Sequence, residues 1–315
     1  MLAQIAQDLV AVMQRDVRTD WTVRDDVRAK LRSSIKRLRP ASCSCARPVR
    51  FGRQPTGGGV TVADEVLVER DGGILLITLN RPQAKNAVNR ALAEALAAAL
   101  DELDGDDALQ VGVITGAGGS FSAGMDLKAF LQGEFPTVKG RGFGGITEAP
   151  PEKPLIAAVE GYALAGGFEI VLSCDLVVAA RDARFGIPET RVGLLAGAGG
   201  LIRLPQRIPV NIAMECALTG EPFTAEQARG WGLVNRLTEP GDALPAAREL
   251  ALKIAENGPL GIRASKKILR EAPYWPADEL WDRQRSAMSP VFDSADAKEG
   301  AAAFAEKRPP VWQGK

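Results

Sequence analysis

The alternation of short apolar runs with helical patterns along residues 66–180 most constrains how this chain can fold. The apolar runs at residues 155–159 and 176–179 are typical of buried strands, and a helix is expected to open near Gly166 between them. Two strands connected through a helix pair in parallel within one sheet. The sequence therefore predicts an α/β core.

The beginning of this core carries clear local signals. Runs at residues 66–70 and 74–79 flank Asp71-Gly72-Gly73, and this turn chemistry predicts a hairpin. Asn89 then offers an N-cap for an Ala- and Leu-rich helix over residues 90–103. A further buried strand, residues 111–114, is expected to follow.

We expect three parts along the chain. Residues 1–60 form a basic N-terminal extension, partly helical or disordered, with Gly57-Gly58-Gly59 as a joint near its end. Residues 61–204 form the core with the active site, and residues 205–315 form a helical C-terminal region. Glycine and proline break the helical pattern of this last region at Gly220, Gly230, Pro240, Pro259 and Pro273.

Charge is balanced overall but unevenly placed. The 39 basic and 39 acidic residues cancel, so no global field favours nucleic acid or a membrane as partner. Residues 1–55, in contrast, carry twelve Lys and Arg against five Asp, a net charge of +7. Residues 20–38 resemble the C-terminal helical tail of type I restriction-enzyme motor subunits. This basic arm either contacts RNA, DNA or a membrane, or is a solvated extension.

The chain contains no histidine. Ser-His-Asp triads, Cys-His pairs and His-ligated zinc are therefore excluded. The four cysteines lack paired CxxC spacing, so we expect no metal site and a reducing, cytoplasmic location. No apolar run approaches the roughly 20 residues that span a bilayer. The cysteines are Cys43, Cys45, Cys174 and Cys216.

Without histidine, proton transfer must rest on carboxylates. Glu169 closes the run Gly166-Gly167-Phe168-Glu169, and Glu189 closes the run from Phe185. Upstream, residues 121–126 form a loop of small residues after an apolar strand, where backbone N–H groups can be left free to hold an anion. Together these segments indicate chemistry on a thioester.

These segments belong to a longer series of motifs. Through this series, the chain from about residue 65 to residue 315 resembles the crotonase superfamily, most closely its enoyl-CoA hydratase branch. The resemblance implies a crotonase-like core, a spiral of ββα repeats, and a helical C-terminal trimerisation region. The motifs are Asn80-Arg81-Pro82, Lys85-Asn86-Ala87-Val88-Asn89, Ser122-Ala123-Gly124-Met125-Asp126, the run from Gly161 to Glu169, Cys174-Asp175, Phe185-Gly186-Ile187-Pro188-Glu189 and Gly197-Ala198-Gly199-Gly200.

The resemblance also implies roles for individual residues. The backbone N–H groups of Met125 and Gly166 would form an oxyanion hole for the thioester oxygen. Glu169 would activate the water that attacks Cβ, and Glu189 would deliver the proton to Cα. The coenzyme A groove and acyl site would be lined by Lys85, Asn86, Ala87, Ala123, Met125, Asp126, Leu127 and Gly166.

The predicted function is that of an enoyl-CoA hydratase acting on an acyl-CoA substrate without metal or redox cofactor, and the resemblance implies a homotrimer or a dimer of trimers. An enoyl-CoA isomerase, a carnitinyl-CoA-type dehydratase and a nucleic-acid-binding protein that uses the basic arm are the alternatives. Two departures from the common hydratase pattern bear on the acyl pocket: Met125 replaces a frequent Ala, and Ala165-Gly166-Gly167-Phe168 replaces three glycines and a cysteine. Residues 133–151 are expected to form the variable loop beside that pocket.

Overall fold

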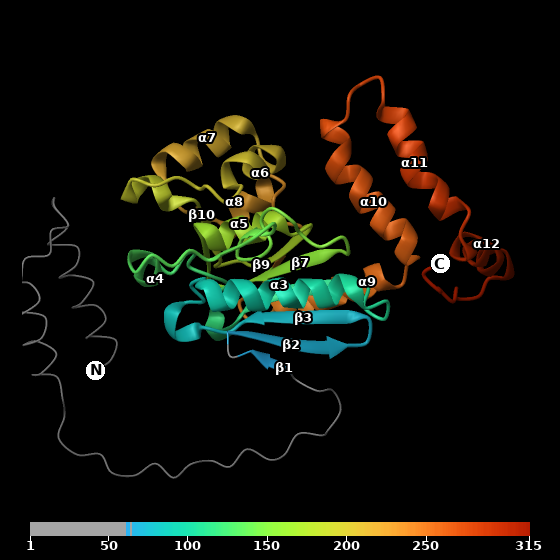
Figure 1. The fold of residues 1–315 in the computed structure, drawn as a ribbon, viewed down its shortest axis with the longest axis horizontal. Coiled ribbons are helices and arrows are strands. Elements are labelled where there is room, and N and C mark those ends of the chain that lie inside the picture. The colour runs from blue at the N-terminus through green and yellow to red at the C-terminus, as the bar shows by residue number, and fades with distance from the viewer. Residues whose placement is uncertain (1–60, 64) are drawn as a thin grey trace, which may run out of the picture. The chain divides into compact units, whose positions relative to one another are not determined.

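The computed structural model describes residues 61–63 and 65–315 (Figure 1). They lie within one compact unit, Gly57–Lys315. The predicted basic N-terminal extension, its glycine joint and any role of this arm fall outside the described residues. The division of the chain into three parts therefore stays a prediction.

The larger sheet of the described chain has seven strands in the order β1-β2-β3-β4-β7-β9-β12. β2 pairs antiparallel with β1 and with β3, and each pairing from β3 to β12 is parallel. The predicted hairpin and the predicted parallel core are thus confirmed. The strands are β1 (Thr61–Ala63), β2 (Val66–Asp71), β3 (Ile74–Leu79), β4 (Val111–Gly116), β7 (Leu155–Val159), β9 (Leu176–Ala180) and β12 (Arg236–Thr238).

A smaller sheet runs beside the first and consists of β8 (Tyr162–Leu164), β10 (Arg184–Gly186) and β11 (Phe223–Thr224). β7 is followed directly by β8, and β9 by β10, so the chain steps from the larger sheet to the smaller one twice. Helix α5 (Gly166–Ser173) follows β8 and returns the chain to β9. This two-strand and helix repeat is the predicted spiral core.

Side-chain alternation along the strands explains why helices cover both faces of the larger sheet. Leu75 and Ile77 of β3 join a core with α3 (Arg90–Gly105), whereas Ile74 and Leu76 join a second core with α9 (Ala243–Ala255). The predicted N-cap of α3 is confirmed, because Asn89 Oδ1 accepts a hydrogen bond of 2.9 Å from the Leu92 N–H. Figure 1 shows α3 lying across the larger sheet.

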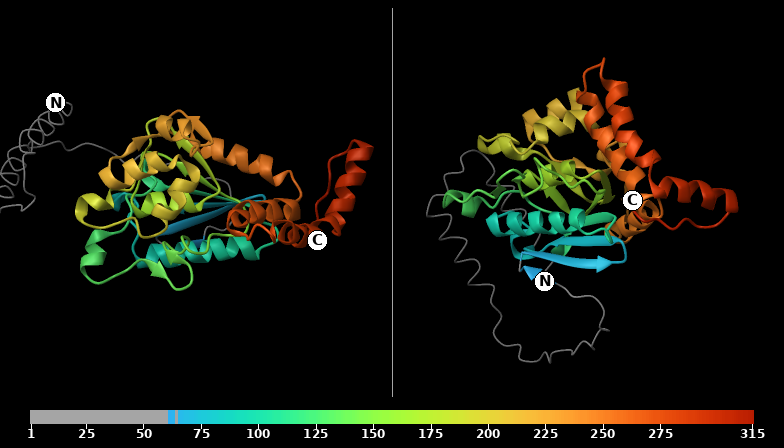
Figure 2. Two further views of the ribbon diagram at one scale, coloured as in Figure 1. Left: turned by 90° about the horizontal axis from the view of Figure 1, so that it is seen from above. Right: turned by 45° about the vertical axis from the view of Figure 1, so that its right-hand side comes forward.

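The C-terminal region is mostly helical, as predicted, and α7 ends at Gly220 in the left-handed conformation. It also contributes β11 and β12, two short strands that the sequence did not indicate. Figure 2 shows the last two helices extending away from the sheets. Helix α6 (Gly200–Arg207) leads into this region, and the α-helices that follow, besides α9, are α7 (Val210–Thr219), α8 (Ala225–Gly230), α10 (Pro259–Glu271), α11 (Leu280–Phe292) and α12 (Ala295–Glu306).

Short elements complete the fold. The loop predicted over residues 133–151 holds the small hairpin of β5 (Thr137–Val138) and β6 (Gly142–Phe143).

Among the described residues, no helix combines the length and the apolar character needed to cross a membrane. The remaining elements are α4 (Leu127–Leu131) and four 3-10 helices: η1 (Pro82–Ala84), η2 (Ala117–Gly119), η3 (Pro188–Val192) and η4 (Ala272–Tyr274).

Candidate active site

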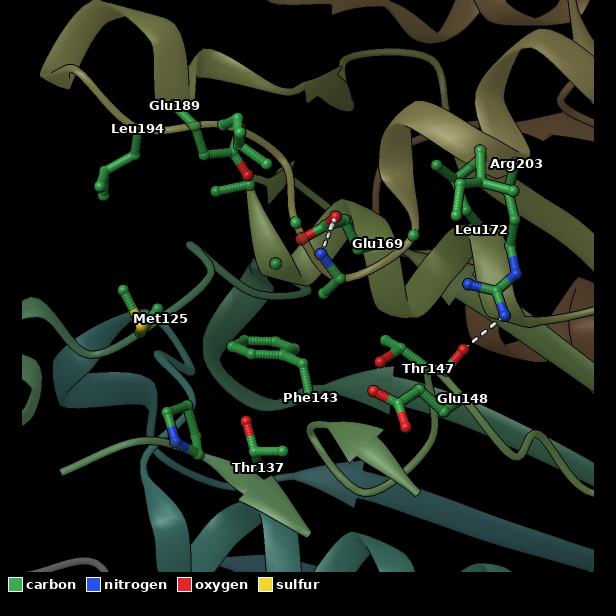
Figure 3. A pocket seen from close by; sticks show the side chains of 18 of the residues that line it. Met125, Thr137, Phe143, Thr147, Glu148, Glu169, Leu172, Glu189, Leu194 and Arg203 are labelled. Carbon is green, nitrogen blue, oxygen red and sulfur yellow. Dashed lines mark hydrogen bonds between the residues drawn. The ribbon is translucent and has the colours of Figure 1, made fainter. Parts of the chain in front are cut away.

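A cavity of about 1560 Å³ lies where α4, α5, η3, α6 and α10 approach one another, and Figure 3 shows it from close by. Its wall includes both predicted catalytic glutamates and both predicted oxyanion-hole residues. The structure thus brings together residues that are up to 66 positions apart in the sequence. The predicted residues that line it are Ala123, Met125, Leu127, Gly166, Glu169 and Glu189.

The direction of the Met125 N–H follows from a single parallel bridge between Val88 and Met125. Val88 donates its N–H to Gly124 O at 2.7 Å and accepts the Asp126 N–H at 2.9 Å. In a parallel bridge of this kind, the residues before and after Met125 make the hydrogen bonds to Val88. The N–H of Met125 itself therefore points away from Val88. Within the described chain this N–H has no hydrogen-bond acceptor.

Gly166 supplies the second N–H. It is the first residue of α5, and the first N–H groups of a helix lack an acceptor four residues back. Ala165 before it is held at φ 50° and ψ −131°, a region that side chains rarely adopt, while its N–H donates to Gly186 O at 2.9 Å. A Cβ on Gly166 would lie 2.4 Å from Phe143 Cζ. A side chain at position 166 would therefore require the Phe143 ring to move.

Glu169 lies in the first turn of α5 and is 3% exposed. Its Oε1 accepts hydrogen bonds from the N–H groups of Ala198 (2.7 Å) and Gly200 (2.8 Å), where α6 begins. Burial raises the pKa of Glu169, against the lowering effects of these two N–H groups and of the nearby Arg203 charge. The backbone thus favours the carboxylate form that burial disfavours.

Glu189 sits at the start of η3 and is half-buried. Burial, assisted by the negative charge of Glu169, raises the pKa of Glu189 to about 7. Its Oε2 is buried and has no hydrogen-bond partner among the described residues. Glu189 can therefore carry a proton at neutral pH and has an oxygen free to pass it on.

Four predicted site residues, Lys85, Asn86, Ala87 and Asp126, do not line this cavity. Lys85 and Ala87 nevertheless lie beside it, because Lys85 O accepts the Ala123 N–H at 2.9 Å and Val88 bridges Met125. The Lys85 ammonium lies 5.5 Å from the centre of the Tyr162 ring. A contact of Lys85, Asn86, Ala87 or Asp126 with coenzyme A therefore stays a prediction.

The side chains of Asn86 and Asp126 are engaged within the protein. Asn86 is fully buried, accepts the Arg81 N–H at 2.9 Å and donates to the carbonyls of Ala117 (2.9 Å) and Ser120 (2.7 Å). Asp126 caps α4 and pairs with Arg81 at 3.0 Å. Although burial opposes the change, the hydrogen bond from Arg81 lowers the pKa of Asp126.

Sequence reasoning did not single out the basic residues of the cavity. Arg203 and Arg207 reach it from α6, and Arg270 reaches it from α10. Arg203 follows the glycine run of residues 197–200 by three positions, which was the one available signal. Arg270 lies in a helix whose path over the cavity depends on tertiary packing, so no local pattern marks it.

The two-sheet spiral and its cavity define a fold of the crotonase superfamily. The sequence matches the family described as Enoyl-CoA hydratase/isomerase over residues 69–315. The chain belongs to this family. Residues 1–39, outside the described part, match a family described as Type I restriction enzyme HindI endonuclease subunit-like, C-terminal, in agreement with the resemblance of residues 20–38.

Individual relatives carry two kinds of name. A carnitinyl-CoA dehydratase of Salmonella enteritidis PT4 is 42% identical over 262 residues, which cover 81% of this chain and 100% of the relative. The crystal structure of an enoyl-CoA hydratase from Mycobacterium tuberculosis H37Rv has 60% sequence identity to this chain and a TM-score of 0.79. The match covers 80% of this chain and 100% of the hydratase chain. The carnitinyl-CoA hydratase structure from Mycobacterium avium is 43% identical, with a TM-score of 0.65 and coverage of 81% and 100%.

Proposed function

We propose that this protein is an enoyl-CoA hydratase, which adds water reversibly to the double bond of a 2-trans-enoyl-CoA. One observation carries the proposal: a single cavity is lined by two glutamates and by two residues whose backbone N–H groups have no acceptor among the described residues. Membership of the enoyl-CoA hydratase/isomerase family supports an acyl-CoA thioester as the substrate.

The proposed reaction begins with the thioester oxygen accepting hydrogen bonds from the N–H groups of Met125 and Gly166. Ionised Glu169 takes a proton from water while the water oxygen bonds to Cβ. The electron pair of the double bond moves toward Cα and the thioester oxygen, where the two N–H groups stabilise the developing charge; each such donor is typically worth about 3 kcal/mol of barrier. Glu189 then gives its proton to Cα, and exchange with solvent restores both carboxyl groups.

The surroundings of the two carboxylates support this division of roles. Glu169 receives two backbone N–H groups, which stabilise a negative charge. Glu189 has a pKa raised to about 7 and an oxygen without a partner among the described residues, which suits a proton donor. The proposed chemistry uses only these side chains and the backbone, so we propose no metal or redox cofactor.

A carnitinyl-CoA dehydratase is the second candidate, and the 42% identical relatives of that name favour it. It would employ the same pair of glutamates in the dehydration direction. An isomerase could move a proton with one carboxylate, so the pairing of Glu169 with Glu189 favours hydration over isomerisation. The nucleic-acid alternative rests on residues 1–55, which lie outside the described part of the chain.

We also propose self-association as a trimer or a dimer of trimers. Large apolar side chains on the two last helices support this assembly, since they are exposed in the single chain and would be buried between copies. Trp281 and Phe292 of α11 are each 68% exposed, and Phe304 of α12 is 88% exposed. The cytoplasmic location stays a prediction.

The activity can be tested on a panel of 2-trans-enoyl-CoA thioesters by following the loss of the conjugated absorbance. Glu169→Gln and Glu189→Gln should each lower kcat by about 10²- to 10⁴-fold, the usual contribution of a general acid or base. Glu215→Gln, an exposed glutamate of α7, serves as the matched control and should keep full activity. A folded wild-type protein that hydrates no member of the panel would refute the proposal.

A further inference from the structure

The cavity has a basic end that the hydration chemistry does not use. Arg203, Arg207 and Arg270 all line it. In Figure 3, Arg203 lies on the side of Glu169 that faces away from Met125. The basic end therefore lies beyond the reacting carbons, where the far part of an acyl group would extend.

Two of these guanidinium groups have only neutral partners. Arg203 donates to the carbonyl of Thr147, and Arg207 donates to the carbonyl of Cys174. Among the described residues, neither arginine forms an ion pair. Glu148 is an exposed residue on the same side of the cavity and is not paired with them. Two half-buried positive charges are thus left without a counter-charge in contact.

The third guanidinium shares its carboxylate with a lysine. Asp175 lies 2.6 Å from Lys266 Nζ and 3.8 Å from Arg270 Nη1, so one negative charge faces two positive ones. The Lys266 side chain is only 10% exposed, which makes it the tighter partner, whereas the Arg270 side chain is 33% exposed. Arg270 therefore keeps capacity for a second anionic partner.

An excess of partly buried positive charge is costly unless an anion offsets it. Burial, together with the charges of Arg270 and Arg207, lowers the pKa of Arg203, and the negative charge of Glu169 offsets only part of this effect. The hydroxyl oxygen of Thr147, which also lines the cavity, is buried and has no hydrogen-bond partner among the described residues. The basic end thus offers positive charge to an anionic ligand.

The geometry of the proposed reaction places an acyl group along this path. Its thioester oxygen lies at Met125 and Gly166, its reacting carbons lie beside Glu169, and its remaining carbons point toward Arg203. We propose that the acyl group ends in a carboxylate bound by Arg203, Arg207 and Arg270. The substrates would then be mono-CoA thioesters of unsaturated dicarboxylic acids. This inference rests on the proposed hydratase function, and it disfavours a quaternary ammonium at the same end, as in a carnitinyl group.

The test compares two 2-trans-enoyl-CoA thioesters of equal chain length, one ending in a carboxylate and the other in a methyl group, over several lengths. At the best length, charge-assisted hydrogen bonds should make kcat/KM at least roughly tenfold higher for the carboxylate. Arg270→Gln should remove most of this preference. Lys267→Gln, at an exposed neighbour on α10, is the matched control and should keep it.

Binding of the saturated thioesters, measured by calorimetry, separates this inference from the proposed activity. Hydration of the methyl-ended substrate with no preference for the carboxylate would overturn the inference and leave the hydratase intact. A binding preference for the carboxylate that Arg270→Gln removes would support the inference even if no substrate were hydrated. Equal binding of both thioesters at every length would overturn it.

Discussion

At the scale of single residues, the backbone around Glu169 and Glu189 makes two identical side chains chemically different. Glu169 is the more buried of the two, yet two N–H groups from the start of α6 stabilise its charge. Glu189 is less buried, and its Oε2 receives no hydrogen bond from the described part of the chain. A proton shared between them therefore favours Glu189, and this asymmetry gives the proposed reaction its direction of proton flow.

The raised pKa of Glu189 predicts the same pH dependence for both directions of the reaction. Hydration starts with the proton on Glu189 and dehydration with the proton on Glu169, so both directions need a pair that holds one proton, and kcat/KM should fall in both as the pH rises above about 7. Initial rates in both directions, measured from about pH 5.5 to pH 9, would test this. Profiles that bend near pH 7 in neither direction would contradict the proton-donor role.

At the scale of elements, the geometry of the site depends on contacts among three neighbouring segments. The turn after η1, the loop of residues 120–126 and the start of α5 contact one another through backbone and buried polar groups. A Cβ on Gly167 would lie 2.5 Å from Ser122 O, so the loop approaches α5 closely only because Gly167 has no side chain. Asn86 joins the first two of these segments through its side-chain amide.

Replacing Asn86 tests this framework. Asn86→Ala would leave the Arg81 N–H and the carbonyls of Ala117 and Ser120 without their partner in a buried setting. We expect the free energy of unfolding to fall by about 3 kcal/mol, since each unsatisfied buried group costs about 1–3 kcal/mol and relaxation recovers part of it. Denaturant unfolding would measure this, with exposed Gln83→Ala as control. An unchanged stability in Asn86→Ala would refute the structural role.

Local patterns predicted the main elements well, because each depends on neighbours in sequence. The runs at residues 74–79 and 155–159 became β3 and β7 with the same bounds, and Asn89 caps α3 as expected. β11 and β12, in contrast, have two and three residues, too few for a periodic signal, and form because a neighbouring strand offers hydrogen bonds.

For the candidate site, the residues that lie in local motifs could be predicted from the sequence, and their distant neighbours could not. The two glutamates and the two backbone donors came from motifs, and the cavity brings them together. The N–H groups that hold Glu169 lie 29 and 31 residues further along the chain, and Arg270 lies 101 residues beyond Glu169. The positions of these residues depend on how α6 and α10 approach the cavity, which periodicity does not encode.

At the scale of the whole molecule, the C-terminal helices leave apolar surface that one chain does not cover. No residue of α11 is buried, although Phe292 and Trp281 lie on it. Isolated helices are marginal without tertiary contacts, so α11 is expected to gain stability from another copy. The stability of the C-terminal region is therefore expected to depend on the proposed assembly.

Analytical ultracentrifugation tests the assembly directly. Chains of 33.4 kDa should sediment as a species of about 100 kDa, or twice that mass for a dimer of trimers. Phe292→Arg should shift the distribution toward the single chain, because a charge replaces an apolar contact, while exposed Lys298→Ala should not. A wild-type protein that stays monomeric at micromolar concentration would contradict the proposed assembly.

The central claim, that the site adds water across the Cα–Cβ double bond of an enoyl-CoA, is tested most directly by labelling both elements of solvent water. A 2-trans-enoyl-CoA turned over in ¹⁸O-labelled D₂O should give a 3-hydroxyacyl-CoA with ¹⁸O at C3 and one deuterium at C2, as read by mass spectrometry. Conversion to a positional isomer that carries deuterium but no ¹⁸O would contradict the account and establish an isomerase instead.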